Sequence, residues 1–69
     1  MPETVRAVVE NGGNVEIVDG RFSVDFIKSL LAIATRSGAQ ITIRASSYST
    51  EVLLDLARLG GGQLTVKFE

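Results

Sequence analysis

The chain has no cysteine, no histidine and no tryptophan among its 69 residues. Without cysteine it forms no disulfide, and without cysteine or histidine it lacks the usual ligands of a zinc site. Ser-His and Cys-His nucleophilic catalysis is excluded for the same reason. A domain of this size buries only about 60% of the surface that its unfolded chain exposes. Its stability must therefore come from packing alone.

Neither sign of charge is in large excess, since seven Lys and Arg against eight Asp and Glu give a net charge of −1. The composition therefore gives no electrostatic basis for binding nucleic acid or an anionic membrane. The longest apolar run, 30–34, is far shorter than the roughly 20 residues of a membrane span. No basic stretch followed by an apolar run marks a secretory signal. We expect a soluble, cytoplasmic protein that needs no metal and no cofactor.

The most informative feature that is present is an internal similarity. Segment 15–17 matches 41–43, and segment 22–27 matches 48–53 without a gap. Segment 64–68 begins a further copy and then stops. The pattern predicts two strand–helix units followed by a final strand.

Each copy has a serine where its helix is expected to begin. Ser23 and Ser49 fit the N-cap position, where the hydroxyl accepts a hydrogen bond from a free backbone N–H. Asp25 and Glu51 then fall in the first turn, where the helix dipole favours an anion. The two occurrences make these helix starts the firmest local prediction.

Apolar residues recur at three- and four-residue spacing over the predicted helices 24–37 and 50–59. Gly38 ends the first helix, and the glycines 60–62 end the second. The second helix is expected to face the core with Val52, Leu53, Leu56 and Leu59. The last two strands are expected to do so with Ile41, Ile43, Ala45, Leu64, Val66 and Phe68. Strands that are apolar on one side only require both helices on that side.

The first thirteen residues fit two structures. Apolar residues alternate from Val5 to Val9, and residues 11–13 make a good hairpin loop, so we favour an N-terminal strand paired with 15–17. A short helix that ends at Gly12 is the alternative. A second, brief hairpin at Asp19-Gly20 is a further alternative for the connection that follows strand 15–17.

The predicted architecture is a two-layer α/β domain with the order β-β-α-β-α-β. It has a four-stranded, mostly parallel sheet with both helices on one face, and only its first strand is antiparallel. The single domain, 1–69, divides into an N-terminal hairpin strand (1–13), two strand–helix units (14–38 and 39–62) and a final strand (63–69).

One stretch resembles a known family. Asp19-Gly20-Arg21, the segment 34–38, the strand 40–45 and a helix opened by Ser49 are similar to the second half of the histidine-containing phosphocarrier (HPr) proteins. The resemblance covers about residues 19–59 and implies an open-faced antiparallel sheet with helices on one side. The family's Gly-Leu-His-Ala-Arg-Pro motif is missing, and Phe26 or its neighbours stand at its regulatory serine. The resemblance therefore implies a related scaffold without phosphotransfer.

The loops between strands and helices are the candidate anion site. Ser46, Ser47 and Ser49 supply hydroxyls at a helix start, and Arg21 lies in the equivalent loop of the first copy. The same residues are explained equally by helix capping. Glycines 60–62 follow a helix and precede a strand, which is the wrong end for a phosphate loop.

The final strand is the candidate interface. Arg44, Thr65 and Lys67 point to the uncovered face of the sheet, and Lys67 and Glu69 carry opposite charges that can pair across a two-fold axis. The uncovered face has no exposed aromatic on which a base could stack, so we expect no nucleic-acid partner.

The sequence thus favours a non-enzymatic protein–protein interaction or assembly module that forms a homodimer. A phosphocarrier-like regulatory domain that binds an enzyme and a small-anion sensor at the strand-to-helix loops are the alternatives. The near-regular repeat also leaves open an artificial sequence that has no function.

Overall fold

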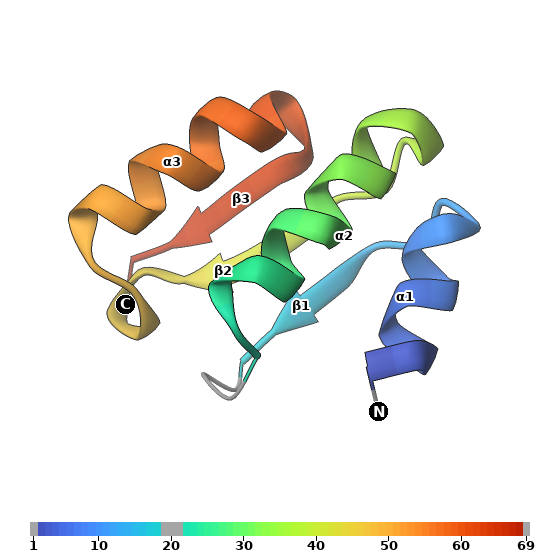
Figure 1. Cartoon of the computed structure of the whole chain (residues 1–69), viewed down its shortest axis with the longest axis horizontal. Helices are drawn as coiled ribbons and strands as arrows, with labels where there is room; N and C mark the ends of the chain where they lie inside the picture. The colour runs from blue at the N-terminus through green and yellow to red at the C-terminus, as the bar shows by residue number, and fades with distance from the viewer. Residues whose placement is uncertain (1, 19–21, 69) are drawn as a thin grey trace.

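The structure is a computed structural model that describes residues 2–18 and 22–68. Helices and strands alternate within these residues: α1 (Pro2–Glu10), β1 (Val15–Ile17), α2 (Val24–Ser37), β2 (Ile41–Arg44), α3 (Thr50–Gly60) and β3 (Leu64–Lys67). Two 3₁₀ turns, η1 (Ala45–Ser47) and η2 (Gly61–Gln63), flank α3. The helices form one layer and the strands another (Figure 1).

In the described residues the sheet has three strands in the order β1-β2-β3, and both pairings are parallel. Val15 lies opposite Ile41, which lies opposite Leu64. The prediction that these strands are parallel is confirmed. Their direction differs from the antiparallel sheet that the phosphocarrier resemblance implies. The brief hairpin at Asp19-Gly20 lies outside the described residues.

The N-terminal segment is a helix, so the favoured hairpin, the fourth strand and the antiparallel edge are wrong. Four-residue spacing places the half-buried Val5 and the fully buried Val9 on one face of α1, while Ala7 is exposed. A helix satisfies its backbone internally, whereas a hairpin strand would have had only the three-residue β1 as its partner. As a helix, the segment buries Val9 without needing a strand partner.

The predicted helix starts are confirmed. The Ser23 hydroxyl accepts a hydrogen bond from the Phe26 N–H at 3.1 Å, and the Ser49 hydroxyl accepts one from the Val52 N–H at 3.3 Å. Gly38 has a φ of 84° and its N–H donates to the Ala34 carbonyl, as a left-handed cap requires.

The end of α3 differs from the prediction because Gly60 is a buried helical residue and not the cap. A Cβ at this position would lie 2.6 Å from Leu31 Cδ2, so the absence of a side chain lets α3 approach α2. Gly61, with a φ of 54°, follows as the residue in the left-handed region.

The core lies between the two layers. Its buried apolar residues are Val9, Ile17, Ile27, Leu30, Leu31, Ala34, Ala39, Ile41, Ile43 and Leu56. Two predicted core residues are wrong. Leu59 is 45% exposed because the buried face of α3 centres on Leu56 and Gly60, and Phe68 is 80% exposed because β3 ends one residue earlier.

Side-chain amides tie the amino ends of the strands together. The Asn14 carboxamide oxygen accepts a hydrogen bond from the Gln40 N–H at 2.9 Å, and Gln40 Nε2 donates to the Gly62 carbonyl at 3.0 Å. Gln63 Nε2 donates to the Ala39 carbonyl at 3.4 Å. These contacts hold the strands in register where their backbones enter the sheet.

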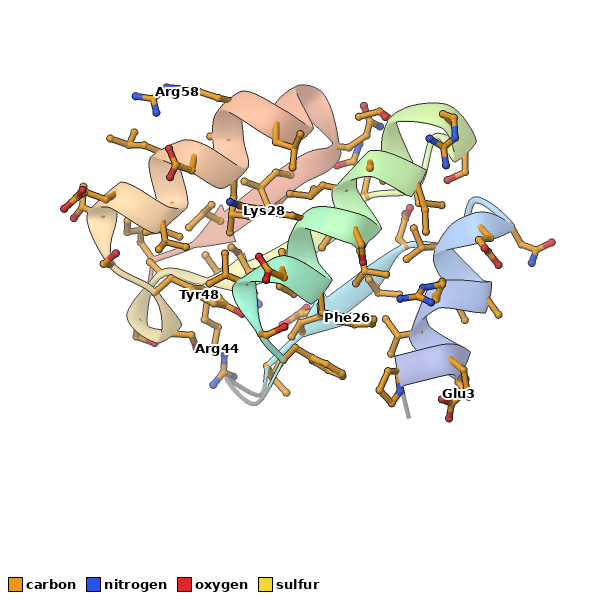
Figure 2. The ribbon with its side chains drawn as sticks, viewed as in Figure 1. Glu3, Phe26, Lys28, Arg44, Tyr48 and Arg58 are labelled. Atoms are coloured by element: carbon orange, nitrogen blue, oxygen red, sulfur yellow. The ribbon has the colours of Figure 1, made fainter. Side chains whose placement is uncertain are left out.

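Aromatic contacts join α1 to α2. Phe26 reaches from α2 toward α1 (Figure 2), and its ring stacks on Phe22 with the centroids 5.0 Å apart. The Arg6 guanidinium of α1 lies 5.6 Å from the Phe26 ring centroid, within cation–π range. At the other end of α2, the Ser37 hydroxyl donates to the Val9 carbonyl at 2.6 Å. α1 is therefore fixed to both ends of α2.

Candidate interaction site

The helices leave the opposite face of the sheet uncovered. Alternation along each strand directs Val15, Ile17, Ile41 and Ile43 toward the helices and the intervening residues away from them. The uncovered face therefore carries Glu16, Thr42, Arg44, Thr65 and Lys67. It is polar and lacks the apolar surface on which a second sheet packs.

The structure brings the predicted interface residues together. Arg44 lies opposite Lys67 on the neighbouring strand, and Thr65 lies opposite Thr42. Lys67 Nζ contacts a Glu16 carboxylate oxygen at 3.2 Å, across the intervening strand β2. Within one copy the Lys67 ammonium thus lies over the sheet face. Glu69, the predicted partner of Lys67 across a two-fold axis, lies outside the described residues.

The outer side of β3 is an edge of the described sheet. β3 pairs with β2 along one side, and its other side faces away from the sheet (Figure 1). Leu64 and Val66 are half-buried and Thr65 is exposed. An edge strand of this kind presents backbone N–H and C=O groups to a further strand.

The serines of the candidate anion site lie in the connection between β2 and α3. Ser46 and Ser47 are exposed in η1, and the Ser49 hydroxyl already accepts the capping hydrogen bond of α3. Arg21, the cation of that site, lies outside the described residues. In the described residues no cavity forms near these serines. Their arrangement is accounted for by the turn and the helix cap.

Tyr48 lies in the same connection, beside Arg44 at the carboxyl ends of the strands (Figure 2). Its hydroxyl oxygen is buried and has no hydrogen-bond partner among the described residues. Burial raises the pKa of the Tyr48 hydroxyl above its ordinary value of 10.0, because the ionised form is poorly solvated there. Tyr48 therefore stays neutral and acts as a packing residue of the loop.

The described residues contain no group of three acidic, cysteine or histidine side chains placed to hold a metal ion. In the same part of the chain, no helix has the length and apolar character needed to cross a membrane.

Sequence reasoning missed the flanks of the outer helices as surfaces. Val8 on α1 is 39% exposed and Leu54 on α3 is 51% exposed, although both are large apolar residues. The available signal was the spacing of uncharged residues, Thr4 and Val8 on α1 and Thr50, Leu53 and Ala57 on α3. This signal identifies a surface only when the side of each helix that faces α2 is known.

No protein-family model, no curated protein and no solved structure matches this chain. The resemblance to the phosphocarrier proteins stays a prediction. A function must therefore be inferred from the chain's own residues.

Proposed function

We propose that this protein is a non-enzymatic assembly module, which acts by protein–protein contact and associates with copies of itself through the β3 edge of its sheet. The observation that carries this proposal is the position of β3 at the edge of the sheet that the described residues form, with half-buried apolar side chains along it. Addition of a strand to such an edge is a common mode of protein recognition.

The β3 edge lacks the features that usually block strand addition. Proteins protect their edges with proline, bulges or charged side chains that project from the edge strand. β3 has no proline, and its one charged residue, Lys67, is held against Glu16. Association through this edge also adds the stability that so small a core lacks.

Two arrangements satisfy the β3 edge. In the first, which the sequence predicts, β3 pairs antiparallel with β3 of a second copy around Thr65 and forms a closed two-fold dimer. In the second, β3 pairs with a different strand of the next copy. Both require a second chain on the same side of β3.

The proposal is tested by sedimentation velocity at micromolar concentration. We expect the wild type to contain species heavier than the 7.4 kDa monomer. Thr65→Lys, which places a charge on the edge, should return the chain to the monomer, as should Thr65→Pro. Thr65→Val, which keeps the strand uncharged, is the matched control and should associate like the wild type. Circular dichroism checks that each variant is folded.

A wild type that stays at 7.4 kDa would overturn self-assembly. Titration with inorganic phosphate, followed by the amide shifts of residues 46–49, addresses the anion-binding and phosphocarrier-like alternatives. We expect no shift, because Ser49 is committed to its cap.

A further inference from the structure

The exposed apolar side chains of this fold are not distributed evenly. The large hydrophobic residues exposed in the described part of the chain are Val8, Val18, Leu54, Leu59 and Phe68. They lie on α1 and α3 or directly after β1 and β3, and none lies on α2 or β2. The exposed apolar surface is therefore confined to the two ends of the row of helix–strand units.

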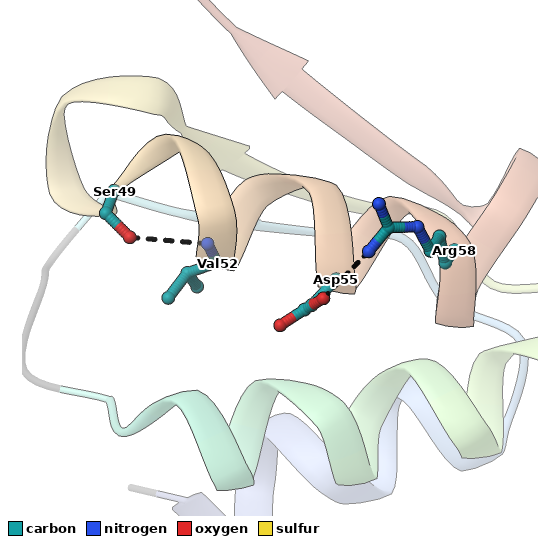
Figure 3. Close-up of polar contacts among 4 residues, drawn as sticks. All are labelled: Ser49, Val52, Asp55 and Arg58. Atoms are coloured by element: carbon teal, nitrogen blue, oxygen red, sulfur yellow. Dashed lines mark hydrogen bonds and ion pairs between the residues drawn. The ribbon is translucent and has the colours of Figure 1, made fainter.

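On α3 the charged residues share one side. Figure 3 shows Asp55 directed toward α2 and paired with Arg58, at 3.0 Å. Glu51 and Arg58 are four and three residues from Asp55, so the three are neighbours on the helix surface, with Arg58 farthest from α2 (Figure 2). Residues two positions away lie about 200° around the helix, which places Leu53 and Ala57 on the opposite flank.

On the flank of α3 opposite Asp55, the residues at helix-stripe spacing are uncharged, and Arg58 projects beside them from the outer side of the helix, away from α2 (Figure 2). The uncharged residues of this flank are Thr50, Leu53 and Ala57, at the spacing of a helix stripe, and Leu54 lies at its border, between Ala57 and Arg58. Thr50, Leu54 and Ala57 are exposed, and Leu53 is half-buried. α3 and β3 lie side by side at the same end of the molecule (Figure 1).

α1 has the same organisation at the other end of the molecule. Its Arg6 lies over Phe26 of α2, and Glu3 and Glu10 are three and four residues from Arg6 on that side. Thr4 and Val8 are each two positions from Arg6 and therefore lie on the flank that faces away from α2. This flank is also uncharged, and α1 lies beside β1, the other edge of the described sheet (Figure 1).

We propose that copies of this chain stack head to tail. In this arrangement β3 of one copy pairs in parallel with β1 of the next copy, and the flank of α3 that carries Leu53 and Ala57 packs on the flank of α1 that carries Thr4 and Val8. The inference rests on the proposed self-assembly and specifies its geometry. The α3–β3 end of one copy then covers the α1–β1 end of the next copy.

The register within one chain extends across this junction. Glu16, Thr42 and Thr65 lie in one row across the sheet, so the next row member after Thr65 is Glu16 of the next copy. On the face of the sheet that the helices cover, the apolar residues of β3 then lie beside the apolar residues of β1 in the next copy. On the uncovered face, β3 with its Lys67 then lies directly beside β1 of the next copy with its Glu16. Within one chain, Lys67 reaches Glu16 across β2.

The two-fold dimer leaves part of this surface uncovered. In that dimer α3 and β3 contact α3 and β3 of the partner copy, but Val8 and the outer edge of β1 stay exposed to solvent. Repeat-like stacks of helix–strand units need polar outer faces at both ends to remain separate, whereas the outer helices of this chain expose Val8 and Leu54. Head-to-tail contact covers both ends and produces rings or open filaments, not a closed pair.

Two variants that block opposite ends test this geometry by sedimentation velocity. Val8→Glu blocks the α1 end and Leu54→Glu blocks the α3 end, so each variant alone should lose all species heavier than 7.4 kDa. An equimolar mixture should form a one-to-one dimer, because each variant keeps the end that the other lacks. Leu59→Glu, a leucine of similar exposure on the α2 side of α3, is the matched control and should assemble like the wild type.

The outcomes separate the inference from the proposed function. If the wild type associates and Val8→Glu associates equally well, assembly stands but the head-to-tail geometry is wrong. If the mixture of the two variants stays monomeric, the geometry is also overturned. If the wild type is a monomer, self-assembly itself fails. Thr4→Glu blocks the α1 end at an exposed position and replaces Val8→Glu if that variant does not fold.

Discussion

The middle helix–strand unit, α2–β2, and the two outer units, α1–β1 and α3–β3, differ in how deeply they are buried. α2 and β2 contribute Ile27, Leu30, Leu31, Ala34, Ile41 and Ile43 to the core, whereas the outer elements contribute Val9, Ile17 and Leu56. All exposed large apolar residues of the described chain belong to the outer units. A helix–strand unit is therefore well buried only when it has a neighbouring unit on each side, and each outer unit lacks one of these neighbours.

The largest expected effect comes from truncating the middle unit. Leu30 is fully buried, and Leu30→Ala should destabilise the fold by about 2–5 kcal/mol through lost burial and the cavity that remains. Leu54→Ala, at an exposed position of an outer unit, should change the stability of the monomer by less than about 0.5 kcal/mol. Urea unfolding at low protein concentration measures both. Equal losses would contradict the difference between the units.

An intermediate effect is expected at the N-caps of α2, the middle helix, and of α3, an outer helix. Ser23→Ala and Ser49→Ala each remove the hydroxyl that accepts a backbone N–H, and each should cost about 1 kcal/mol. In a domain of this size that loss lowers the melting temperature by roughly 4–8 °C. The two losses should be similar, since a cap is a local interaction. Thermal unfolding followed by circular dichroism decides, and unchanged melting of both variants would contradict the cap assignments.

The smallest effect concerns Tyr48, where α3 begins. Burial raises the pKa of its hydroxyl, so above about pH 10 the unfolded chain loses this proton before the folded chain does. Tyr48 therefore adds no pH dependence to the free energy of unfolding at neutral pH, and its contribution to stability falls as the pH rises past its unfolded value. Tyr48→Phe should remove this component of the alkaline loss. Because Tyr48 is the one tyrosine, its absorbance reports the titration directly, and a midpoint at or below 10.0 would contradict the burial.

The predictable and unpredictable parts of the fold differ in the range of the interactions that decide them. Ser23, Ser49 and Gly38 act within one turn of their own helix, and the sequence predicted each of them. Whether Val5 and Val9 form a strand or a helix depends on the surface that α2 and β1 offer, which no local pattern contains. The prediction for Phe68 failed for a similar reason. Its place in the alternating pattern indicated a core position, but β3 ends before it.

The candidate site shows the same limit. Arg44, Thr65 and Lys67 were found by strand alternation, and the register of the sheet brings them together. The flanks that carry Val8 and Leu54 could not be assigned from the sequence, because the side of α1 or α3 that faces α2 is set by tertiary packing. Once Arg6 and Asp55 fix that side, the uncharged stripes follow from helix periodicity alone.

The most direct test of end-to-end association is the average mass of the wild type by sedimentation equilibrium over a rising concentration series. Head-to-tail stacking predicts that the mass starts at 7.4 kDa, passes twice that value and continues to rise, unless a ring closes at three copies or more. A plateau at twice the monomer mass would contradict this geometry and favour the two-fold dimer. A mass that stays at 7.4 kDa throughout the series would contradict assembly through either end.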